Sequence, residues 1–371
     1  MAKNETVVKA QRNKKVVAIA THASPHLDEI AGICLLKLFG QEKFPGIKRA
    51  KIILWNTSGT PDGRSVEEWE NEGVLIVGMA GSRFDEHPVQ GSKGEKGECA
   101  TTLIAKYLGI DDDPALEPIL KYVLSIDTKA LVCKDGGQYF DLSALVKMLH
   151  EKNPDKPARV IQFAKEAFMA IYEHQKKFFN QTRSEFEAKG QVEIINGPKK
   201  KQLKLLVINT DDPNMQKFAR SPFGGKCDII VQQRSSGNVQ IFTNKFSGLR
   251  IQDVVKIVRH AEQKKRGRIV TGDWKQLEME GTVPGVEMWY YHADGGMLLN
   301  GSITANGVEA TALPLSLIVT AVKIGVNPQH FEEKRQAECL RNICTSQLKN
   351  PCMYFDWGLS RCRTIRYQMN K

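Results

Sequence analysis

The sequence predicts an α/β protein with a parallel-sheet N-terminal domain and a smaller mixed α/β C-terminal domain. Short apolar runs of strand length alternate with helical patterns in the N-terminal part, which is typical of a parallel sheet covered by helices. A long amphipathic segment follows and is long enough to bridge two domains. A second series of strand and helix patterns then begins, and a chain of 371 residues suits two domains better than one.

The N-terminal elements follow from the spacing of apolar residues. Apolar runs bounded by polar turns predict strands at 15–21, 50–56 and 74–79. Apolar residues at helical spacing predict helices at 28–39, 65–72, 98–108, 114–128 and 142–152. Gly40 is the expected C-cap of the first helix. A glycine- and lysine-rich loop from Gln90 to Gly97 has the length and position of a loop that could close over a phosphate.

The second half of the chain restarts the pattern after one long helix. Segment 158–189 carries aromatic residues at helical spacing, and we expect this stripe to belong to the core rather than to a base-stacking surface. Strands are predicted at 203–208, 228–232, 239–243 and 286–291, and helices at 214–219, 251–263 and 314–324. The predicted domains lie at 1–157 and 191–330, with a bridging helix at 158–190 between them and a cysteine-rich basic tail at 331–371.

The composition indicates a polyanionic partner and a reducing compartment. A net charge of +11 and an isoelectric point near 9.1 favour RNA or another oligonucleotide as partner, although a basic balance can also serve solubility alone. Eight cysteines without a secretory signal predict free thiols and a cytoplasmic protein. No apolar run reaches the length of a membrane span, so we expect no membrane partner.

The first polar stretch, from Thr21 to Glu29, lies where a predicted strand becomes a helix. It places His22, His26 and Asp28 close together in the chain. In an open α/β sheet, ligands bind just outside the carboxyl ends of the strands. Imidazole and carboxylate are also the ligands that suit manganese, iron and zinc. The alternative interpretation is a polar turn in which Asp28 only caps the helix.

A second polar stretch follows another apolar strand, and a third acidic residue lies later in the chain. Asp85, Glu86 and His87 come just after the strand predicted at 74–79. Asp127 lies near the end of a predicted helix, from which it could reach the first polar stretch. We therefore expect carboxylates from three separate segments to gather at one edge of the sheet.

These stretches resemble the motifs of the DHH phosphoesterase superfamily, most closely its branch of 3′–5′ RNA exonucleases related to the melanocyte proliferating gene product. Thr21 to Glu29 is similar to the first motif of the family. Asp85-Glu86-His87 stands where the family carries Asp-His-His, and Asp127 stands at its later metal-binding aspartate. The segment 292–296, His-Ala-Asp-Gly-Gly, resembles the branch's C-terminal His-Ala-Ser-Gly segment. The resemblance spans about residues 16–317.

The resemblance implies a metal-dependent phosphodiester hydrolase, acting as an exonuclease on RNA or short oligonucleotides in a cleft between two domains. Manganese or magnesium would supply positive charge and activated water. The implied metal ligands are His22, His26, Asp28, Asp85, Glu86 and Asp127. The implied catalytic residues are Asp28, Asp85 and His87, and the implied substrate contacts are His87, His292, Gly295 and Gly296. The alternatives are a small-molecule phosphohydrolase and a catalytically degenerate nucleic-acid-binding protein.

The sequence departs from the family pattern at two positions. The branch has an aspartate that bridges both metals in the strand before Asp-His-His, but the corresponding run 75–78 has no carboxylate. Glu86 also replaces the first histidine of that motif, although a glutamate can still bind a hard cation. The missing bridge implies a single-metal enzyme, replacement by Asp85 or Glu29, or an inactive relative.

Outside the resemblance, four cysteines lie close together in the tail: Cys339, Cys344, Cys352 and Cys362. Four thiolates suffice for a structural zinc ion or an iron–sulfur cluster. The spacings are wider than in paired Cys-x-x-Cys motifs, so buried free cysteines in an ordinary C-terminal segment are the alternative. The remaining cysteines, Cys34, Cys99, Cys133 and Cys227, have apolar neighbours and are expected in the core.

Overall fold

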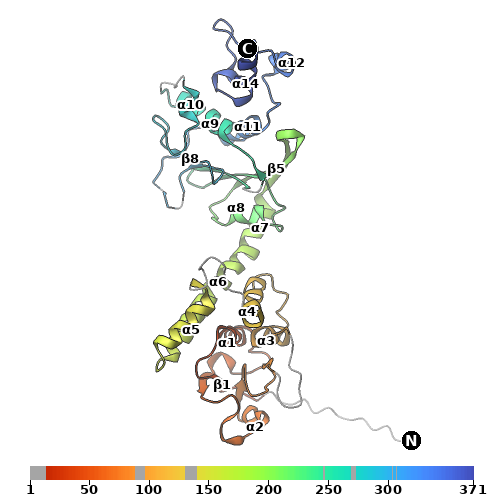
Figure 1. Cartoon of the computed structure of the whole chain (residues 1–371), viewed down its shortest axis with the longest axis vertical. Coiled ribbons are helices and arrows are strands. Elements are labelled where there is room, and N and C mark those ends of the chain that lie inside the picture. Colours follow the sequence, from red (N-terminus) through yellow and green to blue (C-terminus); the bar gives the residue numbers. More distant parts are fainter. Residues whose placement is uncertain are drawn as a thin grey trace, which may run out of the picture. The chain divides into compact units, whose positions relative to one another are not determined.

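The protein is described by a computed structural model that covers residues 14–87, 97–129, 140–244, 247–268, 273–302, 304–305 and 307–371. The chain divides into two compact units, the first ending at Phe179 and the second beginning at Asn180 (Figure 1). Both units are mixed helix and strand. The N-terminal segment before residue 14, most of the predicted phosphate loop and Cys133 lie outside the described residues.

The first unit contains the predicted three-stranded parallel sheet. Its strands are β1 (Ala18–His22), β2 (Lys51–Trp55) and β3 (Val74–Ile76), in the order β2-β1-β3. β1 is central and pairs in parallel with both neighbours, with Ala20 opposite Ile53 and Ile76. Burial of β1 on both faces fits an uninterrupted apolar run. The carboxyl end of β1 therefore opens directly into the first polar stretch.

The helices of the described part of this unit are α1 (Leu27–Phe39), α2 (Val66–Asn71), α3 (Ala100–Leu108), α4 (Glu117–Lys129), α5 (Leu142–Lys152) and α6 (Pro157–Lys176). Short 3-10 turns occupy Ile47–Arg49 and Pro61–Gly63. α1 is buried from Leu27 to Leu36 because it packs against α3, α4 and α6 as well as the sheet. Gly40 is its C-cap, as predicted, although with ordinary right-handed φ and ψ. This burial fixes the start of α1, where the polar stretch lies.

The predicted long helix is interrupted. α6 ends at Lys176, a π-helical turn covers Lys177–Thr182, and α7 (Arg183–Lys189) follows. Phe168, Tyr172 and Phe179 belong to the hydrophobic core of the first unit, so much of the aromatic stripe is core as expected.

The second unit has a six-stranded mixed sheet in the order β4-β5-β6-β7-β9-β8. The strands are β4 (Gln191–Asn196), β5 (Gln202–Asn209), β6 (Ile229–Gln233), β7 (Val239–Thr243), β8 (Trp289–His292) and β9 (Met297–Asn300). Only β5 and β6 pair in parallel. The helices are α8 (Met215–Arg220), α9 (Gln252–Lys265), α10 (Trp274–Leu277) and α11 (Leu315–Val326), with a 3-10 turn at Pro198–Lys200.

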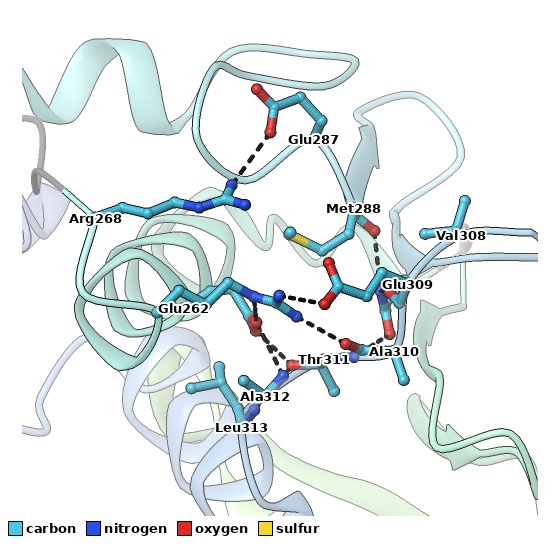
Figure 2. Close-up of polar contacts among 12 residues, drawn as sticks. Glu262, Arg268, Glu287, Met288, Val308, Glu309, Ala310, Thr311, Ala312 and Leu313 are labelled. Atoms are coloured by element: carbon cyan, nitrogen blue, oxygen red, sulfur yellow. Dashed lines mark hydrogen bonds and ion pairs between the residues drawn. The ribbon is translucent and has the colours of Figure 1, made fainter.

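A buried carboxylate ties α9 to the sheet and to the segment before α11. Glu262 is fully buried and accepts hydrogen bonds from the Trp289 indole N–H (3.1 Å), the Ala312 backbone N–H (2.9 Å) and the Thr311 hydroxyl (2.5 Å). Figure 2 shows the Glu262 carboxylate facing Thr311 and Ala312. Arg266 provides the charge partner at 2.6 Å. This anchor satisfies polar groups that the packing of α9 removes from water.

The C-terminal segment shares the core of the second unit. It contains a 3-10 turn at Glu333–Arg335 and helices α12 (Gln336–Leu340), α13 (Met353–Asp356) and α14 (Ser360–Met369). Trp357 and Leu359 are buried in the same hydrophobic cluster as Val254 and Trp289. Lys256 of α9 is fully buried and donates to the Gly358 carbonyl at 2.8 Å. No described helix is long and apolar enough to cross a membrane.

Candidate functional site

The turn after β1 is organised by one buried carboxylate. Glu29 Oε1 accepts from the Thr21 hydroxyl and from His22 Nδ1, both at 2.6 Å, and its Oε2 accepts from the His26 backbone N–H at 2.7 Å. Burial by itself would raise the pKa of Glu29, but the hydrogen bonds from His22 and Thr21 outweigh it and lower the pKa. The same hydrogen bond to Glu29 raises the pKa of His22. Glu29 thereby holds the end of β1 against the start of α1.

Asp28 caps a helix, but not its own. Its carboxylate accepts from the backbone N–H groups of Ala100 and Thr101, each at 3.0 Å, at the N-terminus of α3. The Thr101 hydroxyl donates back to the Asp28 carbonyl at 2.5 Å. The pKa of Asp28 is nevertheless raised, because burial disfavours its charge more than these hydrogen bonds favour it. The turn interpretation of Asp28 was therefore right about capping and wrong about which helix is capped.

Three carboxylates from three elements converge around Asp28. One oxygen each from Asp28, Glu86 and Asp127 lies within 4.8 Å of the other two. Burial and the charges of Asp28 and Asp127 raise the pKa of Glu86 to about 7. Burial, followed by the charge of Asp28, also raises the pKa of Asp127. Glu86 Oε2 is buried and has no hydrogen-bond partner among the described residues. The group has the composition of a hard-cation site: oxygen donors, excess negative charge and one unsatisfied acceptor.

A second ligand group shares Glu86. Asp85, Glu86 and His87 also offer donor atoms within 4.8 Å of one another. Asp85 Oδ1 accepts from the His87 backbone N–H (3.1 Å) and lies 2.8 Å from His87 Nδ1, while Oδ2 accepts from the Gly81 N–H at 2.7 Å. The His87 side chain is 65% exposed. Glu86 is therefore common to both groups.

One residue of the run 75–78, Gly78, has no space for a side chain. Gly78 has φ +72°, and a Cβ on it would lie 2.7 Å from Glu29 Cγ and 3.1 Å from Glu29 Oε1. Glycine is therefore required both by the backbone conformation and by the close approach of Glu29. The Glu29 carboxylate occupies the space into which a side chain at residue 78 would project.

The two histidines of the first stretch lie beside the carboxylates rather than among them. His22 Nδ1 is hydrogen-bonded to Glu29, and His26 is exposed. Neither belongs to a ligand group among the described residues. His150, which the sequence did not single out, is buried and its Nε2 lies 3.1 Å from the Pro25 carbonyl. A single histidine on a predicted amphipathic helix does not indicate, in the sequence, that its side chain contacts the Pro25 carbonyl.

The predicted substrate contacts in the second unit form the turn between β8 and β9. The Gly295 N–H donates to His292 Nδ1 at 2.7 Å. The Gly296 carbonyl accepts from both the backbone N–H and the hydroxyl of Thr243, each at 3.0 Å. A Cβ on Gly296, which has φ +59°, would lie 2.1 Å from Thr243 Oγ1. The turn therefore requires glycine at both positions for reasons of local structure. Substrate binding at this turn stays a prediction.

Comparison with known proteins assigns the chain to no family. No family model matches the chain, and no curated protein matches it. Among solved structures, an uncharacterized protein from Helicobacter pylori G27 is similar at 13% sequence identity, over 66% of this chain and 90% of that chain, with a TM-score of 0.22. A likeness at that score carries no argument about function.

Proposed function

We propose that this chain is a divalent-metal-dependent phosphodiester hydrolase of the DHH type, acting on RNA or short oligonucleotides. The observation that carries the proposal is the convergence of Asp28, Glu86 and Asp127 with a buried, unpartnered oxygen on Glu86. A manganese or magnesium ion bound there would supply Lewis acidity and activated water. The order of the motifs along the chain and their positions after strands support the DHH assignment.

The surrounding residues have separate tasks in this proposal. The hydrogen bonds from α3 fix the orientation of Asp28, so its carboxylate is held in place before any ligand arrives. Asp85 holds His87 through Nδ1, which directs Nε2 toward a substrate phosphoryl oxygen. The pKa of His87 is raised, because the hydrogen bond that its Nδ1–H donates to Asp85 and the charges of the nearby carboxylates outweigh burial. A protonated imidazole at this exposed position suits contact with a phosphate.

We propose a nucleic acid as the substrate because of the positive net charge of the chain. The chain carries a net charge of +11, and exposed lysine clusters lie at 199–201 and 264–265 of the second unit. Such clusters neutralise backbone phosphates, and each alone is an ordinary solvated surface. The site is acidic, so positive charge elsewhere on the chain is what would attract a polyanion.

The proposal is tested by cleavage of an end-labelled RNA oligonucleotide in the presence of Mn²⁺. Asp28→Asn and Asp127→Asn should each abolish cleavage, because both remove a ligand charge, while Asp111→Asn, an exposed aspartate of the same unit, should cleave as wild type does. Cleavage at the wild-type rate by either site variant would overturn the assignment. Turnover of a dinucleotide or pyrophosphate but not RNA would favour the small-molecule alternative.

A catalytically inactive RNA-binding protein is the second candidate, because the run 75–78, where the family has its bridging aspartate, contains no carboxylate. Salt-sensitive RNA binding without cleavage in any divalent metal would support it.

A further inference from the structure

The four cysteines of the C-terminal segment meet at one small cavity. Cys339 lies in α12, Cys352 is the N-cap of α13, Cys362 lies in α14, and Cys344 lies in the connection between α12 and α13. The cavity is lined by all four of these cysteines together with Arg335, Thr345, Ser346, Phe355 and Ile365. The segment brings these side chains together although it contains only short helices.

Burial in an apolar core does not account for this gathering. All four cysteines are free thiols, so the cluster is not a pair of disulfides. Cys352 and Cys362 are buried, but Cys339 and Cys344 are partly exposed, which is unusual for cysteines that act only as small apolar residues. The other described cysteines, Cys34, Cys99 and Cys227, are each buried, as predicted for core cysteines.

The cluster is also surrounded by buried cationic groups. The Arg361 side chain is 7% exposed; its Nη1 lies 3.8 Å from an Asp253 carboxylate oxygen, but its Nε and Nη2 have no hydrogen-bond partner among the described residues. Arg363 Nε and Arg366 Nε are likewise buried and unpartnered. Arg366 donates to Cys344 Sγ at 3.3 Å, and Arg335 lines the cavity. Buried guanidinium groups are costly unless negative charge lies close by.

A metal centre with four thiolate ligands would supply that charge. Four thiolates around a divalent zinc ion, or around a doubly charged iron–sulfur cluster, leave a net charge of −2. The arginines beside the cysteines would then lie near a negative centre instead of neutral thiols, and Arg366 already donates to Cys344 Sγ. Hydrogen bonds to the sulfur atoms are a regular feature of such centres.

We propose that Cys339, Cys344, Cys352 and Cys362 bind one metal centre through their thiolates. Among the described residues, no three of the sulfur atoms lie within 4.8 Å of one another. Sulfur atoms on a tetrahedral zinc ion lie about 4 Å apart, so zinc binding needs the side chains to close in. An iron–sulfur cluster places several iron atoms between its ligands, so it accepts sulfur atoms that lie farther apart than zinc ligands do.

The centre would fasten the C-terminal segment to the second unit. Cys352 and Cys362 belong to the hydrophobic cluster that also contains Trp357 and Leu359, and the connection from 341 to 351 has little regular structure. A metal that joins four points of this segment would contribute to its folding free energy. The first unit and its carboxylate site would be unaffected, so this inference is independent of the proposed hydrolase activity.

The test is metal and sulfide analysis of the full chain purified without oxygen. The variants are Cys339→Ser and Cys344→Ser, at the partly exposed positions where folding is least at risk. The control is Cys227→Ser, a buried cysteine of the same unit whose Sγ contacts the Gly224 carbonyl, a hydrogen bond that serine can keep. Wild type and Cys227→Ser should contain iron with an equal amount of acid-labile sulfide, and both site variants should lose it.

The outcomes separate the two kinds of centre. Stoichiometric zinc without sulfide, lost in both site variants, would support the four-thiolate centre and replace the cluster by a zinc ion. Protein isolated without metal is incubated with ferrous iron and sulfide, and separately with Zn²⁺. Failure to take up either, or metal content that is the same in Cys339→Ser, Cys344→Ser and wild type, would overturn the proposal. Manganese binding, measured on the same preparations, tests the separate carboxylate site formed by Asp28, Glu86 and Asp127 in the first unit.

Discussion

At the scale of single residues, the protonation state of the Glu86 carboxyl should depend on whether the site binds a cation. Its pKa is raised to about 7 by burial and by the charges of Asp28 and Asp127. A protonated carboxyl is a poor metal ligand, so below this pKa a cation must displace a proton, and above it the carboxylate is already ionised. Metal affinity should therefore rise with pH and level off above about 7.

Calorimetric titration with Mn²⁺ at several pH values between about 6 and about 8 measures this dependence. Glu86→Gln should lower the affinity by at least roughly tenfold and flatten the pH dependence, because the titrating ligand is gone. Glu67→Gln, at an exposed position of α2, is the control and should behave as wild type. An unchanged pH profile in Glu86→Gln would show that another group controls metal binding.

Gly78 gives a second prediction at this scale. Gly78→Ala should destabilise the first unit by about 1–3 kcal/mol, since the new Cβ meets Glu29 and the backbone has positive φ. Gly109→Ala is a matched control: its φ is +70°, but nothing lies within 4 Å of its Cβ. The difference between the two free energies of unfolding, measured by chemical denaturation, isolates the contact with Glu29. Equal destabilisation would mean that Gly78 is required by its backbone conformation alone.

At the scale of elements, Glu262 anchors α9 to β8 and to the segment before α11. Burial would raise the pKa of Glu262, but hydrogen bonds from Thr311, Ala312, Trp289 and Arg266 outweigh it and lower the pKa. A depressed carboxyl pKa contributes stability above the unfolded value of 4.5, and that stability is lost as the pH falls through the folded pKa.

Glu262→Gln should therefore reduce the stability of the second unit at neutral pH by about 1–3 kcal/mol and weaken its acid sensitivity. Glu309→Gln is the control, because Glu309 pairs with the same Arg266 but is 66% exposed. Thermal unfolding followed at neutral and acidic pH measures both effects. An equal loss of stability in both variants would show that burial of the Glu262 carboxylate does not cause the destabilisation.

Elements with uninterrupted apolar runs or clear helical spacing could be predicted from the sequence, and others could not. β2 and β3 lie within the runs that predicted them, and β1 extends one residue beyond its run, to His22; buried parallel strands are apolar on both faces. β4 was missed: it is an edge strand on which Val192 and Ile194 are exposed, so it has no buried apolar run. β9 was missed because it is only four residues long and follows a glycine turn. The π-helical turn after α6 has no signal in the apolar pattern.

At the scale of the whole molecule, the site is assembled from segments that are far apart in the chain. The sequence identified Asp28, Asp85, Glu86 and Asp127 as candidates because each follows or ends a recognisable element. It could not show that Asp28 would be held by the N-terminus of α3, because that depends on how α1 packs against α3. It also could not show that the C-terminal segment shares the core of the second unit, because the aromatic residues of that segment are spaced irregularly.

RNA binding should depend on the charge of the whole chain rather than on the metal site. With a net charge of +11, the dissociation constant for an RNA oligonucleotide should rise steeply with salt, by roughly tenfold or more between low and physiological ionic strength. Asp127→Asn should retain this salt dependence while losing cleavage, since it removes a ligand but no cation. Fluorescence anisotropy across a salt series measures it. Binding that is insensitive to salt would exclude backbone phosphates as the main contact.

The central claim is that Asp28, Glu86 and Asp127 together hold a hard cation, and the most direct test is an anomalous difference map from crystals soaked in Mn²⁺. We expect a manganese peak in direct contact with carboxylate oxygens of all three residues, with Asp85 and His87 beside it. Crystals of Asp127→Asn treated in the same way should show a weaker peak or none. No peak at these carboxylates in the wild-type crystals, or ordered manganese only elsewhere, would contradict the account.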